Sequence, residues 1–353
     1  MEAVKYASMS TFLNEILEQP EALQRLLDGE YQQIKRVAAE INKRPPRLVL
    51  IAARGSSDNA ARYGKYLFGV HNRLPVALAA PSLFTLYQSP PCLKDALVLT
   101  ISQSGQSPDI CAVAEEGRRQ GALTIAITND IHSPLAKVAG DCIQLLAGPE
   151  RAVAASKTYT SSLLSLAMLS VALSGDTGLQ RLMGSVPGYV SSALQQKRDV
   201  MDSVTQYADA DACVTIGRGY NYSTAYEIAL KLKELTYILA EPYSSADFQH
   251  GPVALVQDRF LVLAVVPEGK PALELTRFLE GLQPRDPRMV IIASRKRTLL
   301  LGETAIRLPG RVPEWLSPIP AVVLGQLFSL GLAQARGLDP DHPRGLTKVT
   351  RTR

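Results

Sequence analysis

The stretch LVLIAARGSSDNAARYGKYL, residues 48–67, runs from an apolar segment through a glycine turn into an alanine-rich segment with helical spacing. The stretch ACVTIGRGYNYSTAYEIALKL, residues 212–232, repeats this order in the second half of the chain. A strand, a tight turn and a helix in succession form the unit from which parallel sheets are built. The match between the two stretches therefore predicts an internal duplication of one α/β unit.

Further apolar runs bounded by Gly, Pro and Ser follow each of these stretches. They begin near residues 74, 95, 122 and 142 in the first half, and near 238, 259, 288 and 304 in the second. Helical patterns lie between them, such as SPDICAVAEEGRRQGA at 107–122. This alternation predicts an α/β fold with a mostly parallel sheet in each half.

The length of 353 residues suggests about two domains. We expect an N-terminal helical segment at 1–42, a first domain at 43–195, a second domain at 196–335 and a C-terminal tail at 336–353. A helical stretch from about 153 to 205 is expected to link the two halves.

The composition, 46% hydrophobic and 20% charged, is typical of a globular protein with a sizeable core. The net charge of +5 is scattered, without a run of five like charges, which argues against a nucleic-acid partner and is compatible with an anionic small molecule. Two apolar stretches, 161–175 and 319–335, contain Ser or Gln, and we expect buried core helices there rather than membrane spans.

The four cysteines are far apart and form no CxxC motif, so neither a disulfide framework nor a zinc site is predicted. Residues 1–20 lack the apolar core and cleavage site of a signal peptide. These features together favour a cytoplasmic protein that needs no metal and no cofactor.

Small polar side chains gather where two strands of the first half are expected to end. Ser102, Gln103, Ser104 and Ser107 follow one strand, and GSSDN at 55–59 follows another. Ligands of open parallel sheets bind at the carboxyl ends of the strands, where helix N-termini favour anions. The two clusters therefore indicate a phosphate site, although Ser, Asp and Asn also serve as ordinary helix caps. A nucleotide is disfavoured, because neither GxxxxGK[ST] nor a complete GxGxxG occurs.

The helix expected after the second glycine turn carries a polar stripe. Glu227, Lys231 and Glu234 are spaced at i, i+4 and i+7 and fall on one face. Such a stripe is most often a solvated ladder of ion pairs. Because this helix begins at the edge of the second sheet, its charges are also candidates for contact with a ligand.

Two further candidates lie near turns. His250 precedes Gly251 and Pro252, which place the imidazole on a loop where proton transfer near neutral pH is feasible. Lys348 follows PRGL in the tail, and a lysine there can serve as an amine nucleophile if the tail is ordered. Basic chain ends are, however, commonly frayed.

Together these stretches resemble the sugar isomerase (SIS) family. The matching segments are SQSG (102–105), ERAVAASKTYT (150–160), GRG to YEIALKLKE (217–234), AEPYSSADFQHGP (240–252) and PRGLTK (343–348). They occur in order along most of the chain. Within the family, the chain is most similar to the isomerase half of glucosamine-6-phosphate synthases and to the SIS-type glucosamine-6-phosphate deaminases.

The resemblance implies two tandem flavodoxin-like domains, a phosphosugar substrate and a homodimer with sites near the subunit interface. It implies that the phosphate is held by the first domain and that the tail completes the site. The implied roles are a base between C1 and C2 for Glu234, with Lys231 beside it, ring opening for His250, a Schiff-base amine for Lys348, and backbone contacts to the sugar for Val153. The implied phosphate cradle comprises Ser57, Ser102, Gln103, Ser104 and Ser107.

The chain also departs from the synthases. Met1 is followed by Glu2 with no room for a glutaminase domain, Ala155 stands at a hydroxyl position, and Asp247-Phe248-Gln249 precedes His250 in place of Glu-Leu-Lys. Glutamine is therefore not expected to be the nitrogen donor, and the same chemistry run in reverse predicts a glucosamine-6-phosphate deaminase. The alternatives are a deglycase acting on a fructosamine 6-phosphate such as fructoselysine 6-phosphate, and a non-catalytic sugar-phosphate-binding regulator.

Overall fold

The computed structural model describes residues 10–350. Two helices open this part of the chain, α1 (Thr11–Leu17), capped by the hydroxyl of Ser10, and α2 (Gln19–Lys43). These helices lie within and just beyond the part of the chain where the sequence predicts a helical segment. The predictions for residues 1–9 and 351–353 lie outside the described residues.

The first half forms a five-stranded parallel sheet in the order β2-β1-β3-β4-β5. Every residue of its central strand β3 is buried, as expected for a sheet covered on both faces. Its strands are β1 (Leu48–Ala52), β2 (Val76–Leu78), β3 (Ala96–Ile101), β4 (Leu123–Thr128) and β5 (Asp141–Gln144). Its helices are α3 (Gly55–Asn72), α4 (Ser82–Thr85), α5 (Pro108–Arg119) and α6 (Pro134–Val138).

The second half repeats this arrangement with five parallel strands in the equivalent order β7-β6-β8-β9-β10. Its strands are β6 (Ala212–Gly217), β7 (Leu239–Ser244), β8 (Leu261–Val266), β9 (Arg288–Ala293) and β10 (Thr304–Arg307). Its helices are α11 (Tyr222–Thr236), α12 (Ser245–Gln249), α13 (Ala272–Leu282) and α14 (Lys296–Leu299). The shared strand order is that of flavodoxin-like sheets, which confirms the predicted fold class.

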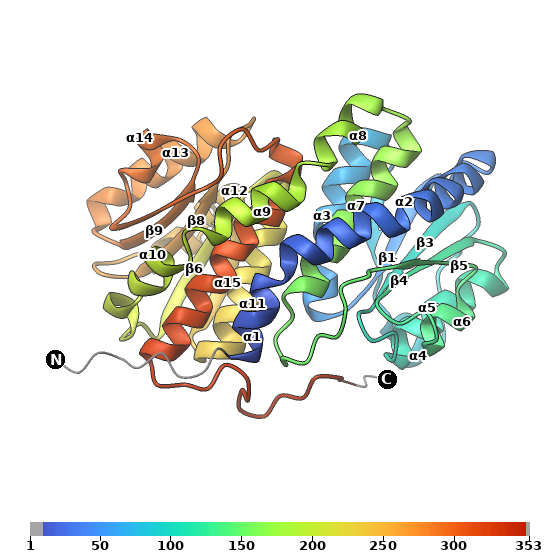
Figure 1. Cartoon of the computed structure of the whole chain (residues 1–353), viewed down its shortest axis with the longest axis horizontal. Coiled ribbons are helices and arrows are strands. Elements are labelled where there is room, and N and C mark those ends of the chain that lie inside the picture. Colours follow the sequence, from blue (N-terminus) through green and yellow to red (C-terminus); the bar gives the residue numbers. More distant parts are fainter. Residues whose placement is uncertain (1–9, 351–353) are drawn as a thin grey trace.

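A layer of helices lies between the two sheets (Figure 1). It includes α7 (Lys157–Ser174), α9 (Val186–Leu194) and α15 (Pro318–Ala335), and one continuous apolar cluster joins the inner faces of both sheets through it. In α7 the residues Lys157–Val171 are all buried. In residues 10–350, Glu314–Ala335 is the one helical segment long and apolar enough to cross a membrane, and it is entirely buried. Both apolar stretches are thus core helices, as predicted.

The helical stretch predicted at about 153–205 is interrupted. It contains α7, α8 (Thr177–Met183), α9 and α10 (Lys197–Asp202), with a left-handed Gly175 ending α7 and Pro187 in the first turn of α9. Proline is favoured in a first turn and glycine just beyond a last turn, so these residues set helix boundaries. Short 3-10 turns complete the described structure: η1 (Thr205–Tyr207), η2 (Gly219–Asn221), η3 (Pro252–Leu255), η4 (Gln283–Arg285) and η5 (Glu314–Leu316).

Candidate active site

A cavity of about 330 Å³ lies where β1 and β3 end. Seven of the residues singled out from the sequence line it, namely Ser57, Gln103, Ser104, Ser107, Val153, Glu234 and Lys348. They come from both halves of the chain and from the tail. Three others, Ser102, Lys231 and His250, do not line this cavity, which we call the first pocket.

Two helix N-termini point toward the first pocket. Ser107 is the N-cap of α5, and Gly55 opens α3 immediately before Ser56 and Ser57. The positive ends of the two helix dipoles and the nearby hydroxyls together form an environment suited to an anion. Ser102 does not line the first pocket; its side chain is 7% exposed and its Oγ accepts a hydrogen bond from the Gly105 amide at 3.2 Å. It holds the turn that presents Gln103 and Ser104.

The polar stripe on α11 is buried, so the interpretation as a solvated ladder is wrong for Glu227 and Lys231, whose side chains are 0% and 1% exposed. Lys231 Nζ contacts a carboxylate oxygen of Glu234 and lies 3.4 Å from Glu227 Oε1. Glu227 in turn accepts hydrogen bonds of 2.8 Å from Ser56 Oγ and Asn59 Nδ2. The stripe therefore ties α11 to the start of α3, beneath the first pocket.

Burial and these contacts shift the pKa values of Glu227 and Lys231. Burial raises the pKa of Glu227, and the neighbouring charge of Lys231 only partly offsets this. Burial acts to lower the pKa of Lys231, but Glu234 and Glu227 outweigh it and the pKa is raised. Lys231 is thus held as an ammonium between two carboxyl groups, and Glu234 is the member of the stripe that reaches the pocket.

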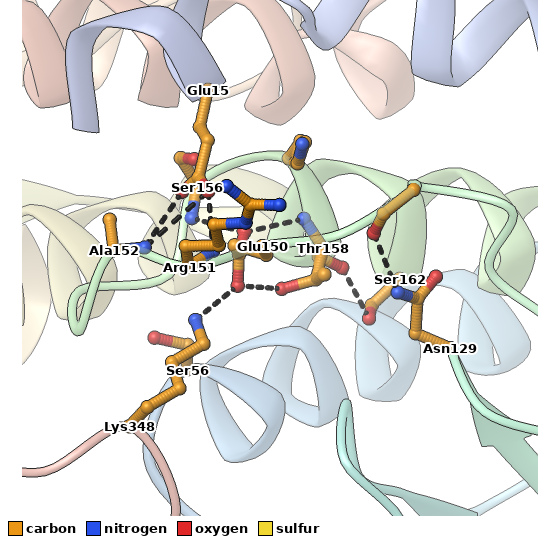
Figure 2. A network of polar contacts seen from close by, with 12 residues as sticks. Glu15, Ser56, Asn129, Glu150, Arg151, Ala152, Ser156, Thr158, Ser162 and Lys348 are labelled. Atoms are coloured by element: carbon orange, nitrogen blue, oxygen red, sulfur yellow. Dashed lines mark hydrogen bonds and ion pairs between the residues drawn. The ribbon is translucent and has the colours of Figure 1, made fainter. Parts of the chain in front are cut away.

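Lys348 is anchored by a buried carboxylate. Its Nζ lies 2.7 Å from Glu150 Oε2, and Figure 2 shows this contact crossing from the tail to the loop before α7. Glu150 also accepts hydrogen bonds from the amides of Ser156 and Thr158 and from the Thr158 hydroxyl, at 2.9, 3.0 and 2.7 Å. Burial acts to raise the pKa of Glu150, yet Lys348 and these donors prevail and the pKa is lowered. Glu150 therefore stays ionised and holds the tail at the pocket.

Two earlier contacts guide the tail to this point. Asp341 accepts hydrogen bonds from the Thr11 and Phe12 amides at 2.8 and 2.9 Å, which satisfies the first turn of α1. The Arg344 amide then donates to the Tyr237 hydroxyl at 2.7 Å. Figure 1 shows the tail running from the end of α15 along one edge of the molecule toward the first half. The described part of the tail is therefore held at three points.

The loop that carries Val153 is fixed from α1. The carboxylate of Glu15 accepts hydrogen bonds from the backbone amides of Arg151 and Ala152, as drawn in Figure 2. This carboxylate is 3% exposed. The backbone at Val153 is thereby set at the pocket wall.

Two charged residues of the pocket lining, Glu150 and Arg54, were not identified as site residues from the sequence. Glu150 lies at the first position of the ERAVAASKTYT motif, so its place in that motif was the available signal. Arg54 precedes the GSSDN cluster, and its Nε donates to the buried carboxylate of Asp109 at 2.9 Å. Arg54 adds a guanidinium to the wall formed by Ser56 and Ser57, which further favours an anionic ligand.

His250 ends α12 and is exposed. Since it does not line the first pocket of its own chain, the described chain brings the predicted base and amine together without the predicted ring-opening group.

The SIS domain family matches residues 42–172 and 206–333, which together make up most of the chain. The chain belongs to this family. Its curated relatives include glutamine--fructose-6-phosphate aminotransferases [isomerizing] of Pyrococcus horikoshii, 32% identical over 95% of the chain, and of Thermococcus kodakarensis, 34% identical over 95%. The SIS chain spans 56% and 57% of those two proteins and corresponds to their isomerase half.

Solved structures show the same fold. A protein assigned as a phosphosugar isomerase from Silicibacter pomeroyi DSS-3 is 35% identical with a TM-score of 0.86, covering 94% of this chain and 100% of that one. The C-terminal domain of glucosamine-fructose-6-phosphate aminotransferase from Francisella tularensis is 25% identical, with a TM-score of 0.85 and coverage of 97% and 100%. A glucosamine-6-phosphate deaminase from Thermotoga maritima, 22% identical over 97% of this chain and 100% of that one, shares the fold with a TM-score of 0.79.

Proposed function

We propose that this SIS protein converts glucosamine 6-phosphate to fructose 6-phosphate and ammonia. The observation that carries the proposal is the composition of the first pocket. Glu234 and Lys348 line the same cavity as Ser57, Ser104 and Ser107. A base, an amine and an anion cradle are the groups that an aldose–ketose conversion of an amino-sugar phosphate requires.

The phosphate is proposed to bind between the starts of α3 and α5. Ser57, Ser104 and Ser107 donate hydrogen bonds there, and Arg54 supplies charge. The volume of about 330 Å³ is near the lower end of the range for small-molecule pockets and is large enough for a hexose phosphate.

Glu234 is proposed to move the proton between the two carbons. Its carboxylate takes the proton from C2 of the open-chain amino sugar and returns it to C1, while a second proton passes from the C2 amine to O1, so that the aldehyde becomes a C1 hydroxyl and the amine becomes a C2 imine. The contact with Lys231 keeps Glu234 placed on the pocket side of α11.

Lys348 is proposed to act on the C2 imine. Its ammonium gives a proton to the imine nitrogen and leaves Glu150, the free amine adds to C2, and the bond between C2 and the original nitrogen breaks to release ammonia, which leaves the sugar bound to lysine as an imine. Water then adds to C2 and releases fructose 6-phosphate with the free lysine. Borohydride added with fructose 6-phosphate should therefore trap a covalent adduct that Lys348→Ala cannot form.

A homodimer is part of the proposal. His250 is exposed and outside the first pocket of its own chain, so a second copy of the chain is the proposed source of the imidazole that opens the sugar ring.

The test is release of ammonia from glucosamine 6-phosphate by the purified full chain, with unphosphorylated glucosamine and the Glu234→Gln variant as controls. Release from the phosphate ester by the native chain alone is expected. Release of lysine from fructoselysine 6-phosphate, with no ammonia from glucosamine 6-phosphate, would establish the deglycase instead. Tight binding of the sugar phosphate without turnover of either substrate would indicate a regulator.

A further inference from the structure

A second cavity, of about 630 Å³, lies where the strands β6, β7 and β8 of the second sheet end. Residues after each of these strands line it, including Arg218, Asp247 and Lys270. The carboxyl edge of an open parallel sheet is the usual place for a ligand. We call this cavity the second pocket.

The second pocket has the same framework as the first. Gly55 and Gly219 follow the first strand of each half, with φ of +54° and +62°, and each follows an arginine in extended conformation. Arg54 pairs with Asp109 near the start of α5 at 2.9 Å, and Arg218 pairs with Glu274 near the start of α13 at 3.0 Å. The duplication has therefore retained the turn and the ion pair that shape a pocket at this edge.

The two pockets also share two helices that cross between them. The start of α3 and Glu234 near the end of α11 line the first pocket, whereas Tyr222 at the start of α11 and Tyr66 in the second half of α3 line the second. Each of the two helices therefore begins at one pocket and contributes a later residue to the other.

The linings differ in charge and in shape. Where the first pocket has serines, the second has the rings of Tyr66 and Tyr222. Its charged groups are two cations, Arg218 and Lys270, and three carboxylates, Asp247, Glu274 and Glu314. The lining therefore carries a formal excess of one negative charge, which disfavours a phosphate.

Two of the three carboxylates in the second pocket already have partners within the chain. Glu274 is engaged by Arg218 and by the Ser245 hydroxyl, and Glu314 accepts a hydrogen bond from the Lys270 amide. Asp247 is exposed and forms no ion pair within residues 10–350. It is the carboxylate open to a cationic ligand, and tyrosine rings beside it are the surface on which an ammonium or the apolar face of a sugar ring packs.

We propose that the second pocket is a separate binding site for an unphosphorylated hydroxylated amine of the hexosamine class, with the ammonium at Asp247 and the ring against Tyr66 and Tyr222. This inference goes beyond the proposed reaction and does not rest on it, because it concerns other residues and is measured by binding alone.

The test is a titration of the full chain with glucosamine in which saturation-transfer NMR measures binding. Glucose serves as the matched ligand without a charge. Glucosamine is expected to bind more tightly than glucose. Asp247→Asn should weaken glucosamine binding about threefold to fivefold, the size expected for a partly exposed ion pair, and should leave glucose unchanged. Lys270→Ala should strengthen glucosamine binding, because it removes a like charge from the lining.

Competition with fructose 6-phosphate separates the two sites, because its phosphate is proposed to bind in the first pocket. Glucosamine binding that survives an excess of fructose 6-phosphate supports the second site, and binding that fructose 6-phosphate displaces belongs to the first pocket and overturns the proposal. Equal affinity for glucose and glucosamine, or weaker glucosamine binding in Lys270→Ala, also overturns it. Circular dichroism of each variant confirms that the fold is retained.

Discussion

Replacement of Glu150 by glutamine is expected to release the C-terminal tail from the first pocket. Glutamine keeps the size of the side chain but loses the charge that holds Lys348 Nζ at 2.7 Å. One of its two polar atoms becomes a donor, so the four hydrogen-bond donors that now converge on the carboxylate can no longer all be satisfied.

The size of the effect follows from the burial of the pair. The side chain of Glu150 is fully buried and that of Lys348 is 24% exposed. A hydrogen bond to a charged group contributes about 1.5–3 kcal/mol, and Lys348 recovers part of this when it returns to water. We take about 1.5–2 kcal/mol for the docking contact, which corresponds to a rise of roughly 10- to 30-fold in the ratio of undocked to docked tail.

Limited proteolysis measures this ratio. Trypsin can cleave after Arg344 only when the tail leaves Tyr237, whose hydroxyl accepts the Arg344 amide. Mass spectrometry of the intact chain measures the rate of this cleavage. The rate is proportional to the undocked fraction of the tail when docking and undocking are fast relative to cleavage. We expect faster cleavage and lower turnover in Glu150→Gln, with the body of the protein intact. Glu40→Gln, which breaks the exposed pair with Lys43, serves as the control and should change neither quantity.

A double-mutant cycle decides whether the effect acts through Lys348. Lys348→Ala should accelerate the cut after Arg344 to a similar extent, and adding Glu150→Gln to it should produce little further change, because both substitutions remove the same contact. Tail protection and turnover at native levels in Glu150→Gln would refute the reasoning.

Further predictions concern the phosphate, the proton, the dimer and acid pH. Ser104→Ala should raise KM for glucosamine 6-phosphate about tenfold at similar kcat, since one hydrogen bond to a charged group is lost, and an unchanged KM would contradict the cradle. Glu234→Gln should bind substrate but incorporate solvent deuterium at least ~10²-fold more slowly. Mixing Glu234→Gln with His250→Ala chains should restore about a quarter of native activity if sites are shared across a dimer, and none if each chain supplies its own histidine. The lowered pKa of Glu150 means that tail docking is complete at neutral pH and lost only as the pH falls below the ordinary glutamate value of 4.5, so hydrogen exchange showing release already at pH 6 would count against this ion pair.

The fold was predictable because its signals are local. Each apolar run bounded by turn residues became a strand, and α5 spans Pro108–Arg119 as the pattern indicated. The helix boundaries within 153–205 were harder to predict, because the stretch contains several short helices that Gly175 and Pro187 end or start. Periodicity alone does not distinguish one long helix from several short ones packed on the same core.

The site was predictable only in part, because several of its contacts join distant residues. Glu150 and Lys348 are 198 positions apart, and Ser56 and Glu227 are 171 apart. The spacing of Glu227 and Lys231 is most often that of a solvated ladder, and only the place of the helix at the edge of the sheet favoured contact with a ligand; packing of α11 against α3 buries both side chains. Burial of that kind depends on how two helices pack, which spacing along one of them does not determine.

The duplicated arginine pairs show which part of the pocket is framework and which part is specificity. Arg54–Asp109 and Arg218–Glu274 occupy equivalent places, although one pocket is lined by serines and the other by tyrosines and carboxylates. If the arginines served only the ligand, pockets of such different lining would have no reason to retain the same pair. Their common role is therefore to fix the glycine turn after the first strand against the helix after the third. The choice of ligand then falls to the residues that differ between the halves.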